Sequence, residues 1–253
     1  MEINKVYQGD CLEVMGDIAD KSIDMILCDL PYGTTACKWD TVIPFEPLWK
    51  QYKRIIKGRG AIVLTASQPF TSALVMSNPK MFKYEWIWIK NAGSNFASCK
   101  YQPMKEHENI LIFSDGTHYY YPQKQERSGG GLARTKYKYT PSNTEKRDAM
   151  NGMVMTHTKH NGSNELRFPS SHQKFNRERG LHPTQKPVAL FEYLIKTYTN
   201  EGDLVLDNCA GSGTTGIACY NLKRNYILIE KESEYIDIIN KRFQLLLAQE
   251  CLF

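Results

Sequence analysis

Apolar and polar positions in the first third of the chain alternate between a strand-like and a helix-like spacing. Extended segments are predicted at residues 3–8, 22–28 and 61–65, and helices at 45–56 and 69–76. Strands that alternate with helices are typical of a parallel sheet covered by helices. The N-terminal part therefore predicts an α/β fold.

Two apolar and aromatic runs, 84–89 and 108–113, follow with no helical stretch between them, which favours an antiparallel pair at the sheet edge. From about residue 114 to 181 the periodicity fades and Gly, Ser, Asn, Tyr and Lys dominate. The alternation then resumes, with helices predicted at 187–198, 214–222 and 233–249 and strands at 203–206 and 226–229. We therefore expect one domain made of two halves, 1–114 and 182–253, that carries an insert at 115–181.

Length and composition agree with one large α/β domain that carries an insert. The chain has 253 residues, of which 42% are hydrophobic. No apolar run approaches the roughly 20 residues that cross a bilayer, and the first residues lack the pattern of a secretion signal. We expect a cytoplasmic protein with no membrane contact. The seven cysteines include no Cys-x-x-Cys pair, so neither a disulfide framework nor a cysteine zinc site is indicated.

The positive charge of the chain is concentrated in the insert and its flanks. The net charge is +5, and residues 115–186 contain 13 Lys and Arg against 6 Asp and Glu. Tyrosines and phenylalanines are interleaved with these basic residues. The combination is typical of nucleic-acid contact, although lysine-rich loops are also often just solvated.

A glycine-rich turn, Gly211-Ser212-Gly213-Thr214-Thr215-Gly216, stands between a predicted strand and a predicted helix. Such a turn lets a ligand approach the backbone and the unpaired N–H groups of the helix start. Its spacing also matches a dinucleotide site. Only 37 residues follow Gly216, too few for the rest of a conventional dinucleotide fold, so the N-terminal half must complete the sheet.

The tetrapeptide Asp29-Leu30-Pro31-Tyr32 follows an apolar strand, where α/β sheets bind ligands. An aromatic amine is a poor nucleophile, because its lone pair is delocalised into the ring. The Asp29 carboxylate and the Leu30 carbonyl can accept hydrogen bonds from its two N–H groups. These contacts favour the pyramidal form of the amine, which exposes the lone pair. Tyr32 can stack on a base taken out of a duplex, and Pro31 stiffens the turn. The same four residues also occur by chance as a simple turn.

Together, the tetrapeptide and the glycine turn resemble the amino-methyltransferases of DNA, which methylate the exocyclic nitrogen of adenine or cytosine. Their order, tetrapeptide first, resembles the permuted beta class of that family. The resemblance implies a Rossmann-like methyltransferase fold and S-adenosylmethionine as cofactor, with no metal. Leu30 replaces a frequent second proline, and Asn208-Cys209 replaces a frequent Pro-Phe.

The resemblance also implies roles for further residues. Asp207, Gly211, Gly213 and Thr214 would form the cofactor turn, and Glu230 would bind the ribose hydroxyls. Asp10, with Cys11 beside it, would bind the adenine of the cofactor, unless Asp10 is only a helix N-cap. Thr184 and Lys186 would bind the methionine carboxylate, unless their hexapeptide, 182–187, is only a loop and cap. Lys90 and the stretch 105–109 resemble elements that flank the target base, and His107 has no assigned role.

The expected activity is site-specific methylation of double-stranded DNA at adenine N6, because an acidic first residue such as Asp29 is usual in adenine enzymes of the family. A serine there is more typical of N4-cytosine enzymes, and N4-cytosine methylation remains the alternative. The insert would choose the DNA sequence, with Arg134, Lys136 and Lys138 on the DNA. A homodimer and a companion restriction endonuclease are compatible with this resemblance.

Other classes of function are less well supported. A C5-cytosine methyltransferase is excluded, because its nucleophile is typically a cysteine after proline and the chain has no Pro-Cys. A noncatalytic nucleic-acid-binding module would not need the tetrapeptide. A metal-dependent nuclease built on His157 and His160 lacks the acidic or cysteine residues that would complete a site. Methylation of RNA or of a small molecule makes no demand for so long a basic insert.

Overall fold

The computed structural model describes residues 1–250 apart from 36, 38, 39, 128–165, 179 and 181–184. The chain divides into two compact units, 1–121 with 170–253, and 122–169. In the described part of the second unit, β6 (Gln125–Glu126) pairs antiparallel with β7 (Leu166–Arg167). The predicted domain bounds and the role of the insert remain predictions.

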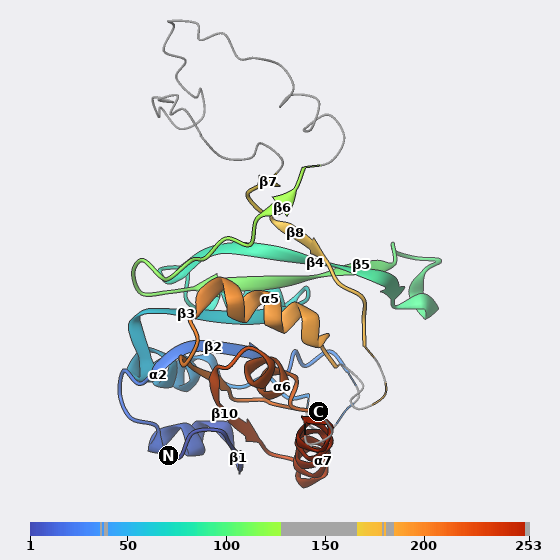
Figure 1. The fold of residues 1–253 in the computed structure, drawn as a ribbon. Helices are drawn as coiled ribbons and strands as arrows, with labels where there is room; N and C mark the ends of the chain where they lie inside the picture. Colours follow the sequence, from blue (N-terminus) through green and yellow to red (C-terminus); the bar gives the residue numbers. More distant parts are fainter. Residues whose placement is uncertain (36, 38–39, 128–165, 179, 181–184, 251–253) are drawn as a thin grey trace, which may run out of the picture. The chain divides into compact units, whose positions relative to one another are not determined.

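The described residues of the first unit form an eight-stranded mixed sheet in the order β1-β10-β9-β2-β3-β5-β4-β8 (Figure 1). The strands are β1 (Lys5–Gln8), β2 (Ile23–Asp29), β3 (Ile56–Ala66), β4 (Phe82–Ser94), β5 (Lys105–Phe113), β8 (His172–Lys174), β9 (Leu204–Asp207) and β10 (Asn225–Glu230). From β1 to β3 all neighbours are parallel, whereas β5 is antiparallel to both β3 and β4. This sheet confirms the predicted α/β class with its antiparallel edge hairpin.

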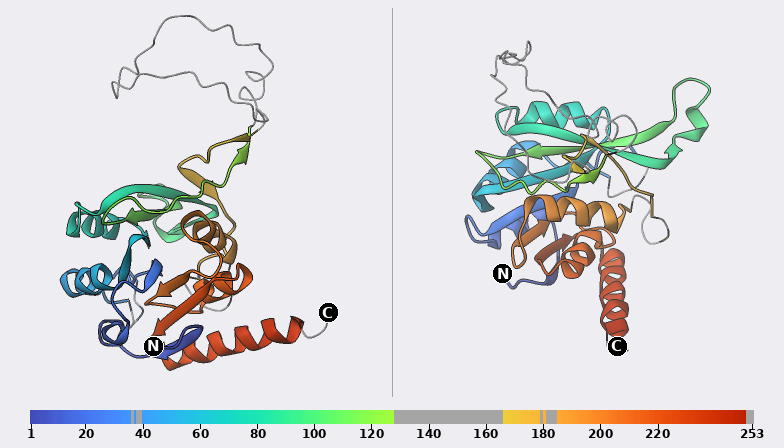
Figure 2. Two further views of the ribbon diagram at one scale, coloured as in Figure 1. Left: turned by 60° about the vertical axis from the view of Figure 1, so that its left-hand side comes forward. Right: turned by 45° about the horizontal axis from the view of Figure 1, so that its top comes forward.

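Helices cover both faces of the sheet (Figures 1 and 2). They are α1 (Cys11–Val14), α2 (Phe45–Ile55), α3 (Phe70–Ser77), α5 (Val188–Tyr198), α6 (Thr214–Asn221) and α7 (Ser233–Glu250), with 3-10 turns η1 (Met15–Asp17) and η2 (Phe96–Ser98). Side chains alternate along β2, so that Ile26 and Cys28 join one core with α1, α2 and α3. Met25 and Leu27 point into the second core, which α5, α6 and α7 complete.

Several elements differ from their predicted bounds. β3 begins at Ile56, five residues before the predicted strand at 61–65, and β4 continues to Ser94 instead of ending at 89. These extensions contain polar residues and glycines, so they lack the apolar pattern from which the strands were predicted. They are strands because their backbone pairs with a neighbouring strand. The short strand β8, parallel to β4, was not predicted, and the helix α1 was anticipated only by the alternative that Asp10 is a helix N-cap.

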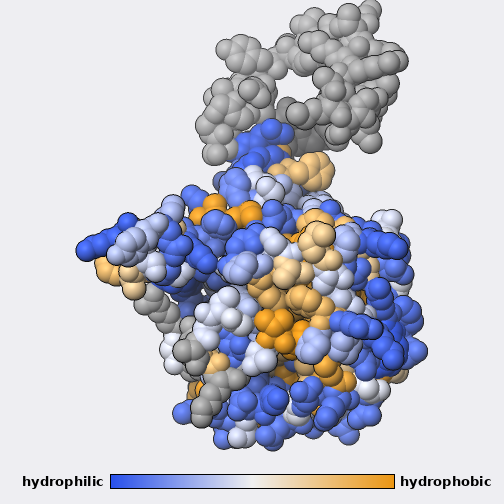
Figure 3. Space-filling model, turned by 180° about the vertical axis from the view of Figure 1, so that it is seen from behind, coloured by the Kyte–Doolittle hydropathy of each residue, from blue (hydrophilic) through white to orange (hydrophobic). Residues whose placement is uncertain are grey.

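The hairpin formed by β4 and β5 extends past the rest of the sheet (Figure 2, right), and it stands out at the left edge of the space-filling view (Figure 3). No helix in the described part of the chain is long and apolar enough to cross a membrane.

Candidate active site

The carboxyl ends of the parallel strands meet at one edge of the sheet, where they border a cavity of about 870 Å³. Crevices at this edge are the usual ligand sites of α/β sheets. Most of the residues singled out from the sequence line it, namely Asp10, Cys11, Asp29, Leu30, Pro31, Tyr32, Lys186, Asp207, Gly211, Thr214 and Glu230. Thr184, Arg134, Lys136 and Lys138 lie outside the described residues.

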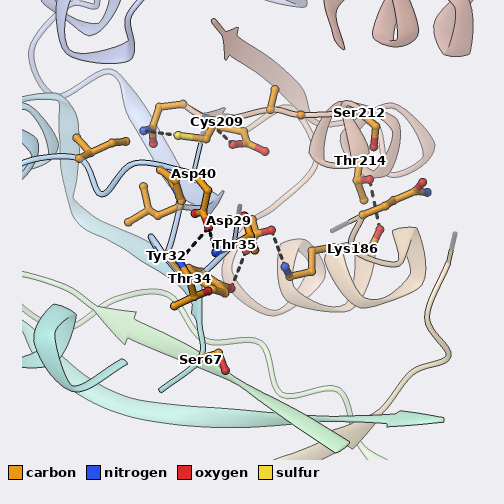
Figure 4. A pocket seen from close by; sticks show the side chains of 18 of the residues that line it. Asp29, Tyr32, Thr34, Thr35, Asp40, Ser67, Lys186, Cys209, Ser212 and Thr214 are labelled. Atoms are coloured by element: carbon orange, nitrogen blue, oxygen red, sulfur yellow. Dashed lines mark hydrogen bonds and ion pairs between the residues drawn. The ribbon is translucent and has the colours of Figure 1, made fainter. Parts of the chain in front are cut away.

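The Asp29 carboxylate, at the end of β2, is held by three side-chain donors. Its Oδ1 accepts hydrogen bonds from the Tyr32 hydroxyl, at 2.7 Å, and from the Thr65 hydroxyl of the neighbouring strand. Its Oδ2 lies 2.5 Å from the Nζ of Lys186 (Figure 4). A carboxylate has about four acceptor positions, so these contacts leave about one position on Asp29 for a ligand.

Lys186 is buried, with only 5% of its side chain exposed, and it pairs with two carboxylates. Besides Asp29, it lies 3.4 Å from Oε2 of Glu108, whose Oε1 is 2.5 Å from Nζ of Lys90. The four side chains, which we call the charge chain, are Lys90, Glu108, Lys186 and Asp29. A buried charge requires such partners, because desolvation otherwise favours the neutral form.

The charge chain shifts the pKa values of two of its members, Lys186 and Glu108. Burial opposes the charge of Lys186, but Asp29 and Glu108 outweigh it and raise the pKa of Lys186 above its ordinary value. Burial also opposes the charge of Glu108, but Lys186 and Lys90 hold the pKa of Glu108 below its usual range. Lys186 was predicted to bind a cofactor carboxylate. That role remains a prediction, and the contact with Asp29 is one that sequence reasoning missed.

The ring of Tyr32 is fixed on one side by packing. It stacks on Phe70 at the start of α3, with 5.2 Å between the ring centroids and 25° between the planes. The Lys186 ammonium lies 5.6 Å from its centroid. Tyr32 therefore lines the cavity with a ring whose position is fixed by packing, as stacking on a base requires.

The loop after the tetrapeptide is closed by Asp40. Its carboxylate accepts from the backbone N–H groups of Gly33, Thr34 and Thr35 at 2.8, 2.9 and 2.6 Å (Figure 4). Burial opposes its charge, but the Thr35 side chain and these backbone donors hold the pKa of Asp40 below its usual range. Asp40 had no predicted role, and the structure shows that it shapes this wall of the cavity.

In the glycine turn, Gly211 and Gly213 both have positive φ, 51° and 77°. A Cβ on Gly213 would lie 2.9 Å from a side-chain carbon of Ile239 in α7. Gly213 is not among the residues that line the cavity. Its requirement for glycine therefore comes from backbone conformation and packing against α7.

Asp207 and Asn208 begin this turn and are almost fully buried. The Asp207 carboxylate accepts from the Thr215 hydroxyl at 2.5 Å and from the Cys209 N–H at 3.0 Å. Burial raises the pKa of Asp207 to about 6. Asn208, one of the departures from the family pattern, accepts a hydrogen bond from the buried Tyr52 hydroxyl at 2.6 Å. The asparagine at position 208 thus links the turn to α2 through this hydrogen bond.

Glu230 is the last residue of β10, and Asp10 follows β1. The two strands are neighbours in the sheet. Glu230 accepts from the N–H groups of Gly211, Lys231 and Glu232 at 2.7, 2.8 and 2.9 Å, which leaves about one acceptor position for a ligand hydroxyl. Asp10 accepts from the Leu12 N–H at 3.0 Å. Asp10 is therefore a helix N-cap, as the alternative held, and it still lines the cavity.

Other side chains at the site had no individual role in the sequence analysis. Thr65, Glu108 and Arg242 reach the site from β3, β5 and α7, and Glu178 accepts from the Val188 N–H at 3.0 Å, at the start of α5. Arg242 donates to the Ser212 carbonyl at 2.6 Å. Only Glu108 had a sequence signal, as a member of the stretch 105–109.

Comparison with known proteins gives consistent matches. Residues 23–241 match the model of the N6/N4 methyltransferase family, described as DNA methylase. Type II methyltransferase M.HpaI of Haemophilus parainfluenzae is 30% identical over 92% of this chain and 72% of its own length. DNA adenine methyltransferase YhdJ of Escherichia coli strain K12 is 28% identical over 93% of this chain and 81% of its own length.

Solved structures resemble the fold. The complex of M1.HpyAVI with SAM has a TM-score of 0.61 and 25% identity, with 94% of this chain and 98% of that one covered. The cytosine-N4-specific PvuII DNA methyltransferase has a TM-score of 0.67 at 15% identity, with 94% and 86% covered. At that identity, the likeness concerns the fold alone.

Proposed function

This chain belongs to the N6/N4 family of DNA methylases, and on that premise we propose that it methylates the exocyclic N6 of adenine at specific sites in double-stranded DNA. The methyl donor is S-adenosylmethionine. The observation that carries the proposal is the Asp29 carboxylate, held at the end of β2 with Lys186 at 2.5 Å and one acceptor position left over.

The residues around the cavity fit this cofactor. A volume of about 870 Å³ lies within the range of ligand pockets, roughly 300–1,000 Å³. The glycine turn lets the cofactor approach the backbone at Gly211. Asp10 and Glu230 would hold its adenosine part. Thr184 and Lys186 are the proposed contacts of its methionine part. When bound, the cofactor supplies an electrophilic methyl group.

The residues of the tetrapeptide would activate the target amine by hydrogen bonding. The free acceptor position of Asp29 receives one N–H of the amino group, and the Leu30 carbonyl receives the other. Both contacts favour the pyramidal nitrogen, whose lone pair is then available to the methyl group. Tyr32 provides a ring for the flipped base to stack on.

Electrostatics then favours the reaction, because positive charge develops on the nitrogen as its bond to carbon forms. The Asp29 carboxylate beside it stabilises that charge. Asp29 also lies where it can accept the surplus proton of the methylated amine. Lys186 and Thr65 hold the carboxylate in place throughout, so that little reorganisation is needed.

The choice of adenine is supported by residue type and by relatives. Asp29 stands where cytosine-N4 members of the family more often have serine. A relative at 28% identity is named a DNA adenine methyltransferase, whereas the cytosine-N4-specific structure shares 15% identity. The relatives named Type II methyltransferases also support a companion restriction endonuclease. The permuted beta class, the homodimer and the DNA contacts of Arg134, Lys136 and Lys138 remain predictions.

The activity can be tested on unmethylated DNA incubated with the protein and S-adenosylmethionine. We expect N6-methyladenine when the digested nucleosides are analysed by mass spectrometry, and modification-sensitive sequencing should locate the site. Asp29→Ala should lose methyl transfer, whereas calorimetry should find a much smaller change in cofactor affinity, because Asp29 contacts the amine directly and the proposed cofactor contact only through Lys186. N4-methylcytosine alone would overturn adenine, and near-normal turnover of Asp29→Ala would overturn the mechanism.

A further inference from the structure

The connection between β4 and β5, residues 94–105, carries an exposed apolar cluster that the proposed reaction does not use; we call it the hairpin tip. Phe96 is 77% exposed, Tyr101 90% and Met104 40%. Single exposed apolar side chains are normal on any protein. A cluster of two rings and a methionine within nine residues of chain is a candidate surface for a partner.

The hairpin tip lies directly beside the cavity. Ser94, Asn95 and Lys105, at the base of the tip, line the cavity that also contains Asp29 and Lys186. Beyond them, the hairpin extends past the edge of the sheet (Figures 2 and 3). A macromolecule whose reacting group enters the cavity would therefore meet the tip.

The backbone of the tip is ordered by its own hydrogen bonds. Asn95 adopts a left-handed conformation, with φ 60°, and its side-chain oxygen accepts from the Lys105 N–H at 2.8 Å. The Ser98 N–H donates to the Asn95 carbonyl, and the Tyr101 N–H donates to the Ser98 carbonyl, both at 2.9 Å. The exposed rings are thus held on a closed turn, which lowers the entropic cost of binding through them.

The charge of the tip selects the class of partner. Residues 91–105 contain two lysines, Lys100 and Lys105, and no Asp or Glu. Aromatic rings that stack on bases, together with cations that neutralise phosphates, are the features of a nucleic-acid surface. An interface between two copies of the chain would need apolar area without this excess of positive charge.

We propose that the hairpin tip binds duplex DNA beside the target nucleotide, with Phe96 and Tyr101 stacked on the bases next to the one that enters the cavity. The proposal rests on the proposed function. Flipping a base out of a duplex costs the stacking of that base on its neighbours. An aromatic ring placed at the gap replaces part of this stacking, as apolar side chains do in proteins that unstack DNA.

The test compares Phe96→Ala/Tyr101→Ala with wild type on two DNA duplexes. One carries the methylated site found by sequencing, and the other has an abasic position opposite the target base, which makes flipping easier. We expect kcat/KM on the paired duplex to fall roughly 5- to 150-fold, the range that the loss of stacking on one base gives. On the abasic duplex we expect a much smaller loss, with unchanged calorimetric affinity for S-adenosylmethionine.

Leu245→Ala is the matched control, since Leu245 is 58% exposed on α7 and does not line the cavity. It should behave as wild type on both duplexes. Equal losses of the double variant on the two duplexes, or no loss, would overturn the proposal. Equal losses with a halved mass in light scattering would assign the tip to an interface between copies. A wild type that binds the duplex without methylating it would contradict the proposed function, and anisotropy of labelled duplex would still test the tip.

Discussion

At the residue scale, Lys186 has two carboxylates within reach, Asp29 at 2.5 Å and Glu108 at 3.4 Å. Burial opposes the charge of Glu108, but Lys186 and Lys90 hold the pKa of this carboxyl below its usual range. Lys186 therefore links the two carboxylates and holds Asp29 at the end of β2. Its removal would leave Asp29 and Glu108 as two neighbouring, partly buried carboxylates with no cation between them.

We therefore predict that Lys186→Met lowers kcat/KM roughly 10- to 100-fold, because the Asp29 carboxylate loses a charge-assisted hydrogen bond worth about 1.5–3 kcal/mol. Lys186→Arg keeps a cation at this position and should restore much of the activity. Lys57→Met removes the partner of Asp24, a partly exposed pair elsewhere on the sheet, and should leave kcat/KM unchanged. An unchanged kcat/KM in Lys186→Met would contradict this role.

The buried Asp207 leads to a prediction for the stability of the protein, because burial raises the pKa of Asp207 to about 6 from an ordinary value near 3.8. Between these two values the folded protein holds a proton that the unfolded chain has released, so stability falls as pH rises through this window. Two pKa units correspond to at most about 3 kcal/mol. Asp207→Asn lacks this loss, and its stability relative to wild type should increase from about pH 4 to pH 7.

Urea denaturation of both proteins at several pH values measures this difference. Asp203→Asn, a change in a partly exposed carboxyl just before β9, serves as the control. A difference between Asp207→Asn and wild type that stays constant across the window would refute the prediction.

At the element scale, the join between the glycine turn and α6 depends on close packing against α7. Gly213 has positive φ, and its missing Cβ leaves room for Ile239 at 2.9 Å. Gly202 has a similar φ of 83°, but among the described residues no atom lies within 4 Å of the position that a Cβ on Gly202 would take. The two glycines therefore separate the cost of backbone strain from the cost of a steric clash.

We predict that Gly202→Ala destabilises the protein by about 1–2 kcal/mol, the cost of a left-handed backbone with a Cβ. Gly213→Ala should cost a further 1–3 kcal/mol or so, since overpacking adds to the strain. Free energies of unfolding from urea titrations measure both. Equal losses in the two variants would show that α7 moves away without cost.

At the scale of the whole molecule, the sheet is assembled from both ends of the chain. β9 and β10, from the C-terminal half, lie between β1 and β2, from the N-terminal half. The site is likewise built from both ends of the chain. Asp29 is the last residue of β2, Asp207 of β9 and Glu230 of β10. The cofactor turn and the tetrapeptide, about 180 residues apart, thus line one cavity.

The sequence by itself determined the α/β class, the order of most elements and the two motifs at strand ends. These depend on local signals: apolar periodicity, glycines in a turn, and polar residues directly after an apolar strand. The rule that α/β sheets bind ligands at the carboxyl ends of their strands then gave both motifs a functional interpretation.

Only the tertiary structure decided which side chains touch. The charge chain joins Lys186 to Asp29 across 157 positions, and the third and fourth members, Glu108 and Lys90, come from the antiparallel pair. No local pattern encodes such a contact, because it arises when distant strands and loops pack and a buried charge must find an opposite one. For the same reason, the resemblance predicted only that Lys186 binds the cofactor. The structure shows that the Lys186 ammonium also contacts the Asp29 carboxylate.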